Sequence, residues 1–172
     1  TPDIGASKVS SARKKMTALN PNVMVVSHQT SVNGENIEEI IKGYDFVVDA
    51  TDNFPSRFLI NDTCVRLGIP YSHGGVLRFF GQTITVLPHS SPCYRCIFPE
   101  PPPDEVASAC CRDGILGVAP GVIGSIQATE AIKYLTGIGE MLTGRLLTFD
   151  ALRMRFREVP VSKNPRCPAC AG

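Results

Sequence analysis

Hydrophobic residues in the first 72 positions alternate between helical and strand-like patterns. Apolar side chains recur at helical spacing in residues 8–19, which predicts a helix that ends before Pro21, because the residue before a proline avoids the α region. Residues 23–27 are apolar and β-branched and predict a short strand. A second, weaker helix is predicted around the isoleucines at 37, 40 and 41.

The next segments continue this alternation. The apolar run Phe46–Val48 is flanked by aspartates and is typical of a strand buried on both faces of a parallel sheet. Ser56 can cap a helix that continues to Gly68, and residues 69–72 predict another strand. The resulting order, α-β-α-β-α-β, is typical of a doubly wound sheet.

From residue 73 onward the pattern changes. A His-Gly-Gly tripeptide at 73–75 interrupts the alternation, and two strands, 76–80 and 82–87, are predicted around Gly81. Residues 88–114 are rich in proline, serine and cysteine. They predict a long loop, and a loop of this length in a compact domain is more often functional than idle.

The last third contains the clearest helical pattern, in residues 121–135. One face of this predicted helix carries Ala128, Ala131, Ile132 and Leu135. Two strands, 146–149 and 154–159, are predicted after it. We therefore predict a single α/β domain, in which a Rossmann-like parallel half-sheet in residues 1–72 is continued by a largely antiparallel second half.

Composition narrows the class of protein. The 172 residues include 17 Lys and Arg against 16 Asp and Glu, a net charge of +1, so the basic surface typical of nucleic-acid binding is not indicated. Hydrophobic residues make up 43% and can build a core, but no apolar run approaches the roughly 20 residues of a membrane span. No secretory leader is evident, which favours a cytoplasmic protein. Because the chain begins at Thr1, we expect it to be processed or part of a longer polypeptide.

Seven cysteines without a secretory signal favour reduced thiols over a disulfide framework. Four of them form two Cys-x-x-Cys pairs, Cys93 with Cys96 and Cys167 with Cys170. Each pair can direct two thiolates at one ion, so the pattern predicts a structural, tetrahedral zinc site that joins the C-terminal tail to the proline-rich loop. The alternative is that one pair is a redox motif or that the pairs never meet; the loop-like sequence around both disfavours a thioredoxin-like motif.

Polar residues after the Phe46–Val48 run predict a second site. Asp52 and Asn53 follow the carboxyl end of this strand, where open α/β sheets bind their ligands. A carboxylate there can hold Mg²⁺ against phosphate oxygens, and the alternative is an ordinary helix-capping turn. Lys8 lies near the start of the first predicted helix, where it can meet an anion or simply be a solvated surface residue.

Three cysteines lie outside the pairs. Cys110 and Cys111 precede the predicted helix at 121–135, and a thiol in this setting can have a lowered pKa and act as a nucleophile. The alternative is a buried small hydrophobic residue, which we expect for Cys64. The three histidines show no spacing for metal ligation or proton relay and are assigned no role: His28, His73 and His89.

Short motifs follow one another along essentially the whole chain. They are Asp3-Ile-Gly-Ala-Ser-Lys8 with Ser11-Ala-Arg13, Asp49-Ala-Thr-Asp-Asn53 with Arg57 and Asn61, Pro92-Cys-Tyr-Arg-Cys96, Phe98-Pro-Glu-Pro-Pro102, Cys110 with Gly114, Gly121-Val-Ile-Gly-Ser125, Phe149-Asp-Ala151, Phe156-Arg157 and the last Cys-x-x-Cys. This combination resembles the ThiF/MoeB/HesA group, the bacterial relatives of ubiquitin-activating enzymes.

The resemblance implies an enzyme that uses ATP and Mg²⁺ to adenylate the C-terminal glycine of a ubiquitin-like sulfur carrier of the ThiS or MoaD type, in thiamine, molybdopterin or related sulfur transfer. By position, it implies that Lys8 contacts the ATP phosphates, and that Asp52, with Asn53 beside it, positions Mg²⁺ and the nucleotide. It implies Zn²⁺ on the four paired cysteines and a homodimer. Cys110 matches a crossover-loop cysteine that forms a covalent link in some members, whereas Cys111 lies where a non-thiol residue is commoner.

Other parts of the family pattern are missing. Its opening strand, Gly-rich nucleotide loop and acidic ribose-binding residue would lie before Thr1, and the chain has no GxGxxG or GxxxxGK[ST] motif. We therefore expect an N-terminally incomplete domain, inactive or partly active alone, with a nucleotide-binding half in residues 1–72 and a carrier-binding, zinc-stapled half in residues 73–172. The alternative is a non-catalytic, zinc-stapled module that binds such a carrier. A nicotinamide dehydrogenase is a distant third hypothesis.

Overall fold

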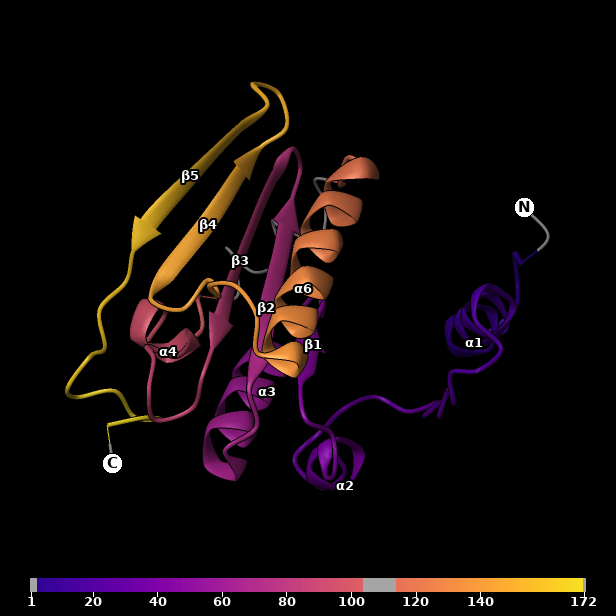
Figure 1. Cartoon of the computed structure of the whole chain (residues 1–172), viewed down its shortest axis with the longest axis horizontal. Helices are drawn as coiled ribbons and strands as arrows, with labels where there is room; N and C mark the ends of the chain where they lie inside the picture. The colour runs from indigo at the N-terminus through magenta and orange to yellow at the C-terminus, as the bar shows by residue number, and fades with distance from the viewer. Residues whose placement is uncertain (1–2, 104–113, 172) are drawn as a thin grey trace. The chain divides into compact units, whose positions relative to one another are not determined.

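The computed structural model describes residues 3–103 and 114–171. It divides into two units, Thr1–Val32 and Asn33–Gly172, which are described separately. The larger unit contains a five-stranded sheet, and the described part of the smaller unit contains one helix (Figure 1). The elements are α1 (Lys8–Leu19), α2 (Ile37–Ile41), β1 (Val47–Asp49), α3 (Phe54–Leu67), β2 (Tyr71–Leu77), β3 (Phe80–Val86), α4 (Tyr94–Ile97), α6 (Val118–Thr136), β4 (Arg145–Asp150) and β5 (Arg155–Pro160).

The smaller unit confirms the predicted helix at 8–19, which is α1. Ser7 caps it, because its hydroxyl oxygen accepts a hydrogen bond from the backbone N–H of Ser10 at 3.3 Å. The strand predicted at 23–27 is wrong: these residues are irregular, and Met24 is 87% exposed. A strand needs a neighbour to satisfy its backbone groups, and no described strand pairs with this segment.

The sheet of the larger unit is mixed, as predicted. Its strand order is β1-β2-β3-β4-β5. The β1 and β2 strands are parallel, with Asp49 opposite His73, and the pairs that follow are antiparallel. The prediction that β1 is buried on both faces is wrong for Val48, which is 49% exposed, because an edge strand of the described sheet is incompletely covered by α6.

The tripeptide at 73–75 does not interrupt the alternation but lies inside β2, and Gly81 lies inside β3 rather than between two strands. Both predictions are wrong because Gly74 and Gly81 allow close packing against α6 and do not form turns. A Cβ atom on Gly74 would lie 2.4 Å from the Gln127 Oε1 atom of α6, and one on Gly81 would lie 2.5 Å from the Ile123 Cγ1 atom of the same helix.

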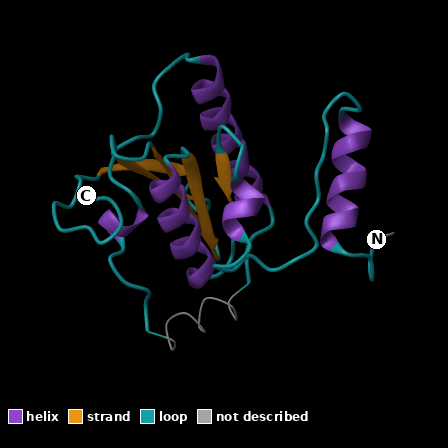
Figure 2. Ribbon diagram, turned by 90° about the horizontal axis from the view of Figure 1, so that it is seen from below, coloured by secondary structure: helices purple, strands orange, loops and turns teal. Residues whose placement is uncertain are grey.

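Helices lie on both faces of the sheet, with α6 on one side and α3 with α4 on the other (Figures 1 and 2). Alternate residues of β2 point to the two layers. The Tyr71 hydroxyl donates to the Asn61 side chain of α3 at 2.7 Å, and the His73 ring packs edge-on against Tyr94 of α4, with ring centroids 4.7 Å apart. The intervening Gly74 faces α6.

The α6 helix meets the sheet with a face that the apolar pattern did not predict. Its buried residues are Ala119, Ile123, Gln127 and Glu130, whereas Ile132 and Leu135 of the predicted apolar face are 57% and 59% exposed. The buried polar residues have partners: the Glu130 carboxylate accepts hydrogen bonds from the Thr85 hydroxyl and the Leu142 N–H, both at 2.6 Å. Among the described residues, no helix is long and apolar enough to cross a bilayer.

Candidate active site and metal centre

The Asp49–Asn53 segment follows β1 and leads into α3. Asn53 is the helix cap, because its Oδ1 atom accepts a hydrogen bond from the Ser56 N–H at 2.9 Å; the prediction that Ser56 is the cap is therefore wrong. The Asn53 Nδ2 atom donates to Asp52 Oδ1 at 3.5 Å. The capping interpretation thus holds for Asn53, while the Asp52 carboxylate is exposed and has no structural ion pair among the described residues.

A buried contact between the Asp49 carboxylate and the His73 imidazole fixes the start of this segment. The Asp49 Oδ2 atom lies 2.7 Å from His73 Nδ1, and its Oδ1 atom accepts hydrogen bonds from the Thr51 N–H at 2.9 Å and the Thr51 hydroxyl at 2.7 Å. Burial raises the pKa of Asp49, but the contacts with His73 and Thr51 outweigh it, and the pKa lies below its ordinary value. The sequence assigned His73 no role; its place directly after the strand predicted at 69–72 was the available signal.

Arg57 and Gln127 also hold the backbone at this end of β1 through hydrogen bonds to carbonyl oxygens. The Arg57 Nε and Nη2 atoms both donate to the Thr51 carbonyl oxygen at 3.1 Å. The Gln127 Nε2 atom donates to the carbonyl oxygens of Asp49 at 2.8 Å and Ser72 at 2.9 Å, which ties α6 to two neighbouring strands. The backbone before Asp52 is therefore held by Arg57 from the following helix and by Gln127, which is distant in sequence.

A cleft of about 1440 Å³ opens beside Asp52. Part of its lining is a row of paired residues that crosses four strands: Gly75 is opposite Gln82, Gln82 is opposite Thr148, and Thr148 is opposite Arg157. At Gly75, a Cβ atom would lie 3.8 Å from Arg57 Nη2, so the row begins at the Asp52 end of the cleft.

A second row lies next to the first. It contains Leu77, Phe80, Asp150 and Arg155, again paired across β2 to β5. Asp150 forms an ion pair with Arg153 at 3.0 Å, and this contact holds the pKa of Asp150 below its ordinary value. The far end of the cleft is therefore lined by Arg153, Arg155 and Arg157 with one carboxylate, whereas the near end is lined by Asp52 and Arg57.

Only two of the three residues predicted to bind the nucleotide lie next to each other in the structure. Asp52 and Asn53 are adjacent at the cleft of the larger unit, whereas Lys8 is the exposed first residue of α1 in the smaller unit. Cys110 and Cys111 lie outside the described residues. Cys64 is fully buried, and burial raises the pKa of its thiol to about 12, as expected for a core residue and not a nucleophile.

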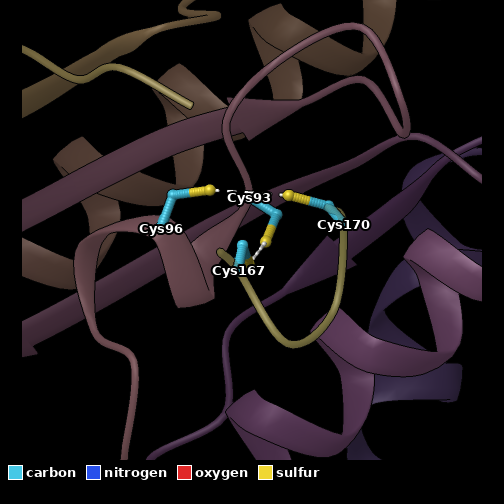
Figure 3. Close-up of side chains that lie close together, drawn as sticks. All are labelled: Cys93, Cys96, Cys167 and Cys170. Carbon is cyan, nitrogen blue, oxygen red and sulfur yellow. Dashed lines mark hydrogen bonds between the residues drawn. The ribbon is translucent and has the colours of Figure 1, made fainter. Parts of the chain in front are cut away.

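The four paired cysteines do meet. Figure 3 shows their sulfur atoms turned toward a common centre, and all four lie within 4.8 Å of one another. The Cys93 and Cys167 sulfurs are 3.5 Å apart, as are those of Cys96 and Cys170. A tetrahedral zinc ion with bonds of about 2.3 Å needs sulfur–sulfur separations of about 3.8 Å, so the donor set and the spacing suit zinc.

Burial and neighbouring contacts shift the pKa values of three of these thiols. Burial raises the pKa of Cys93, and burial together with the neighbouring thiols raises that of Cys170 to about 11. For Cys167, burial also acts to raise the pKa, but hydrogen bonds from the N–H groups of Ala169 and Cys170 outweigh it, and the pKa is lowered. A divalent ion would replace protons on such thiols, because metal ligation requires thiolates.

The metal centre is joined to the cleft through α4, which begins directly after Cys93. The Asn61 Oδ1 atom of α3 accepts a hydrogen bond from the Tyr94 N–H at 2.9 Å, and Arg95 donates twice to the Asp62 carboxylate at 2.7 Å. Because Tyr94 also lines the cleft, the same short helix positions a wall of the cleft and one half of the cysteine cluster.

A comparison with known protein families agrees with the resemblance seen in the sequence motifs. Residues 1–169 match the ThiF family. The chain belongs to the ThiF family. This ThiF-family chain is 47% identical to the sulfur carrier protein adenylyltransferase of Thermus thermophilus, over 99% of this chain and 65% of that protein. It is 48% identical to the SAMP-activating enzyme E1 of Haloferax volcanii, over 98% of this chain and 62% of that protein.

Longer relatives match as well. The adenylyltransferase and sulfurtransferase MOCS3 of Xenopus laevis is 43% identical, over 98% of this chain and 38% of that protein. The ThiF-family chain thus spans less than two thirds of the length of these relatives. Among solved structures, E. coli MccB with AMPCPP and MccA has the same fold, with a TM-score of 0.83 at 17% identity, over 98% of this chain and 52% of that one.

Proposed function

We propose that the protein is an ATP-dependent adenylyltransferase that activates the C-terminal glycine of a ubiquitin-like sulfur carrier. The observation that carries this proposal is the exposed Asp52 carboxylate, which lies at the edge of a large cleft on a backbone fixed by Asp49, His73 and Arg57. Relatives named sulfur carrier protein adenylyltransferase and SAMP-activating enzyme E1 support the choice of reaction and substrate.

The proposed reaction joins a carboxylate to the α-phosphorus of ATP. An oxygen of the carrier's terminal glycine forms the new P–O bond, the bond to the β-phosphate bridging oxygen breaks, and pyrophosphate leaves. Asp52 would hold Mg²⁺, since this ion is commonly bound by one or two carboxylates together with phosphate oxygens. Mg²⁺ supplies neutralisation of the phosphate charge during the transfer.

The chain's own residues bind and orient the two substrates. The Arg57 guanidinium, held by the Thr51 carbonyl beside Gly75, would present positive charge to the terminal carboxylate, and Gly75 leaves room for a chain that ends in glycine. Asn53 would keep Asp52 oriented through its side-chain amide. Lys8 would contact the phosphates, a role that rests on its motif position.

We propose a structural role for zinc. Cys93, Cys96, Cys167 and Cys170 would fill all four positions of a tetrahedral ion, which leaves none for a substrate. The ion would hold the C-terminal tail against α4, where Asn164 already donates its N–H to Cys96 Sγ at 3.4 Å. Its effect on the reaction would pass through the wall of the cleft that α4 forms.

Cys110 is proposed as a nucleophile that acts after adenylation. Its thiolate would attack the carbonyl carbon of the acyl-adenylate, form a thioester with the carrier and release AMP. The support is the position of Cys110 in the family motif, four residues before Gly114. Cys111 has no such match.

We also propose the domain organisation, the oligomeric state and the cellular location that accompany this activity. We infer one ThiF-type domain over residues 1–172, in which residues 1–72 belong to the nucleotide-binding half and residues 73–172 to the carrier-binding half, and which pairs as a cytoplasmic homodimer. The word sulfurtransferase in the name of the MOCS3 relative supports a place in sulfur transfer, such as molybdenum cofactor or thiamine biosynthesis.

The direct test is formation of the acyl-adenylate. The full-length natural protein is incubated with ATP, Mg²⁺ and a carrier that ends in Gly-Gly, and the carrier is analysed by intact-mass spectrometry. We expect a species heavier by one adenylyl group, absent when the carrier lacks its last glycine. Carrier binding without any adenylate would contradict the proposal and favour a non-catalytic, zinc-stapled binding module.

A further inference from the structure

We propose that His73 is a positioning residue for adenylation: its Nδ1–H group holds the Asp49 carboxylate, and this carboxylate holds the turn that presents Asp52 to Mg²⁺. The inference rests on the proposed function, because it takes Asp52 to be the ligand of the ion. His73 acts through these neighbours and not on the substrates, since its side chain is 1% exposed.

The hydrogen bond between His73 and Asp49 has a defined direction. Burial raises the pKa of Asp49, but the contacts with His73 and Thr51 outweigh it, so the pKa lies below its ordinary value and the group is a carboxylate at neutral pH. A carboxylate can only accept hydrogen bonds. The proton in the 2.7 Å contact therefore lies on His73 Nδ1.

The other ring nitrogen of His73, Nε2, is buried and has no hydrogen-bond partner within residues 3–103 and 114–171. A buried polar atom without a partner destabilises a fold, and an apolar ring in this place would avoid that cost. The ring also packs edge-on against Tyr94, with centroids 4.7 Å apart, but a phenyl ring could make this contact as well. What an imidazole adds at this position is the Nδ1–H donor to Asp49.

The Asp49 carboxylate connects His73 to the turn before Asp52. Its Oδ2 atom accepts the hydrogen bond from His73, and its Oδ1 atom accepts those from the N–H group and the hydroxyl of Thr51, at 2.9 and 2.7 Å. Without the imidazole donor, Oδ2 would be a buried, charged atom without a partner, and the carboxylate would turn toward another donor. Thr51 would then lose its anchor, and Asp52, the next residue, would lose its fixed position at the cleft.

Two substitutions at residue 73 separate the hydrogen bond from the packing of the ring. His73→Phe keeps an aromatic ring against Tyr94 but removes the donor, whereas His73→Asn places an amide donor where Nδ1 lies but removes the ring. If the hydrogen bond matters, His73→Asn should resemble the wild type more closely than His73→Phe does; if only packing matters, the order is reversed. His89→Asn is the matched control, because His89 is exposed, does not line the cleft and has a φ of 65° that asparagine tolerates.

The first measurement needs neither nucleotide nor metal. Amide hydrogen exchange of the 172-residue chain, followed by NMR, reports how firmly the Thr51 N–H group is held, and the amides of β3 report global unfolding. Relative to β3, exchange at Thr51 should be about tenfold faster in His73→Phe than in the wild type, as for the loss of one hydrogen bond, and changed by less than about threefold in His73→Asn. Equal protection of Thr51 in the wild type and His73→Phe would overturn the inference.

The second measurement is the Mg²⁺ dependence of carrier-dependent ATP–pyrophosphate exchange in the full-length natural protein. His73→Phe should need about tenfold more Mg²⁺ for half-maximal exchange and approach the wild-type rate at saturating Mg²⁺, because Asp52 is present but less well placed. His73→Asn and His89→Asn should need nearly the wild-type concentration. A lower maximal rate of His73→Phe with an unchanged Mg²⁺ requirement would contradict the inference, since His73 would then not act through Asp52.

Thr51→Val provides an independent variant if His73→Phe does not fold. It removes the hydroxyl contact to Asp49 Oδ1 at the edge of the cleft and should raise the Mg²⁺ requirement in the same direction. If the wild type shows exchange but neither variant that folds needs more Mg²⁺, the inference alone is wrong. If the wild type itself shows no carrier-dependent exchange, the proposed function fails, whereas the protection of Thr51 still decides whether His73 holds the turn.

Discussion

The imidazole Nδ1 atom of His73 lies 2.7 Å from the Asp49 Oδ2 atom, and both side chains are 1% exposed. This pair crosses from β2 to β1 at the last register position of their parallel ladder. The second carboxylate oxygen of Asp49 holds Thr51, the residue before Asp52. A buried carboxylate thus joins the sheet to the segment that carries the proposed metal ligand, and the candidate site depends on a residue that is not exposed in the cleft.

The first prediction concerns acid stability. Because the pKa of folded Asp49 lies below its ordinary value, its carboxylate stabilises the fold fully above about pH 4, and this contribution is lost as the pH falls through the folded pKa. Asp49→Asn should cost about 1–3 kcal/mol at pH 7, and its stability should fall less steeply than that of the wild type below about pH 4. Urea unfolding at several pH values measures both effects.

The exposed Asp45 provides the control, since Asp45→Asn should leave stability and its pH dependence unchanged. Equal acid sensitivity of the Asp49→Asn variant and the wild type would mean that the Asp49 carboxylate and its contacts with His73 and Thr51 do not set the stability of this segment.

Local sequence patterns correctly predicted the helices and strands whose own residues carry a clear hydrophobic pattern. The helix at 8–19 and the β4–β5 strands were evident from the sequence, and the two Cys-x-x-Cys pairs predicted one shared metal site that joins the C-terminal tail to the proline-rich loop. The structure confirms that the two pairs meet. Sequence spacing alone could not decide this, because 70 residues separate Cys96 from Cys167.

The predictions failed where long-range contacts decide the structure. Gly74 was predicted to help interrupt the alternation of helices and strands, but it lies inside β2, where a Cβ atom would clash with Gln127, a residue 53 positions later. Asp49 and His73 are 24 positions apart, so neither residue reveals its partner in a local window. The buried polar face of α6 was missed for the same reason, since Glu130 is satisfied by Thr85 and Leu142 from other elements.

The second prediction concerns zinc. Purified protein should contain one tightly held zinc ion per chain, measured by elemental analysis, and chelation should lower the unfolding temperature because the tail is released from α4. Cys93→Ser should lose most of the metal, whereas Cys64→Ala should retain it, since Cys64 is a buried cysteine outside the cluster. Protein without zinc, or full occupancy in Cys93→Ser, would refute the assignment.

The third prediction concerns assembly. The proposed homodimer should be visible in light scattering as twice the chain mass of 18.6 kDa, with a dependence on protein concentration if the association is weak. A monomer near 18.6 kDa over the whole concentration range would count against the dimer for this chain.

The fourth prediction concerns Cys110. In the full-length natural protein, Cys110→Ala should keep ATP–pyrophosphate exchange but lose a covalent adduct with the carrier on non-reducing gels, because the thiol acts after adenylation. Cys111→Ala should keep both. An adduct that persists in Cys110→Ala would remove the proposed role from this thiol.

The central claim is tested most directly by carrier-dependent ATP–pyrophosphate exchange in the full-length natural protein with Asp52→Ala. Asp52 is exposed, and its recorded side-chain contact is the 3.5 Å hydrogen bond from Asn53, so the variant should unfold at the wild-type temperature. The account predicts that exchange falls by on the order of a hundredfold or more, because the carboxylate that holds Mg²⁺ is removed, while Asp45→Ala keeps full exchange. Exchange by Asp52→Ala at the wild-type rate would contradict the assignment of this cleft as an adenylation site.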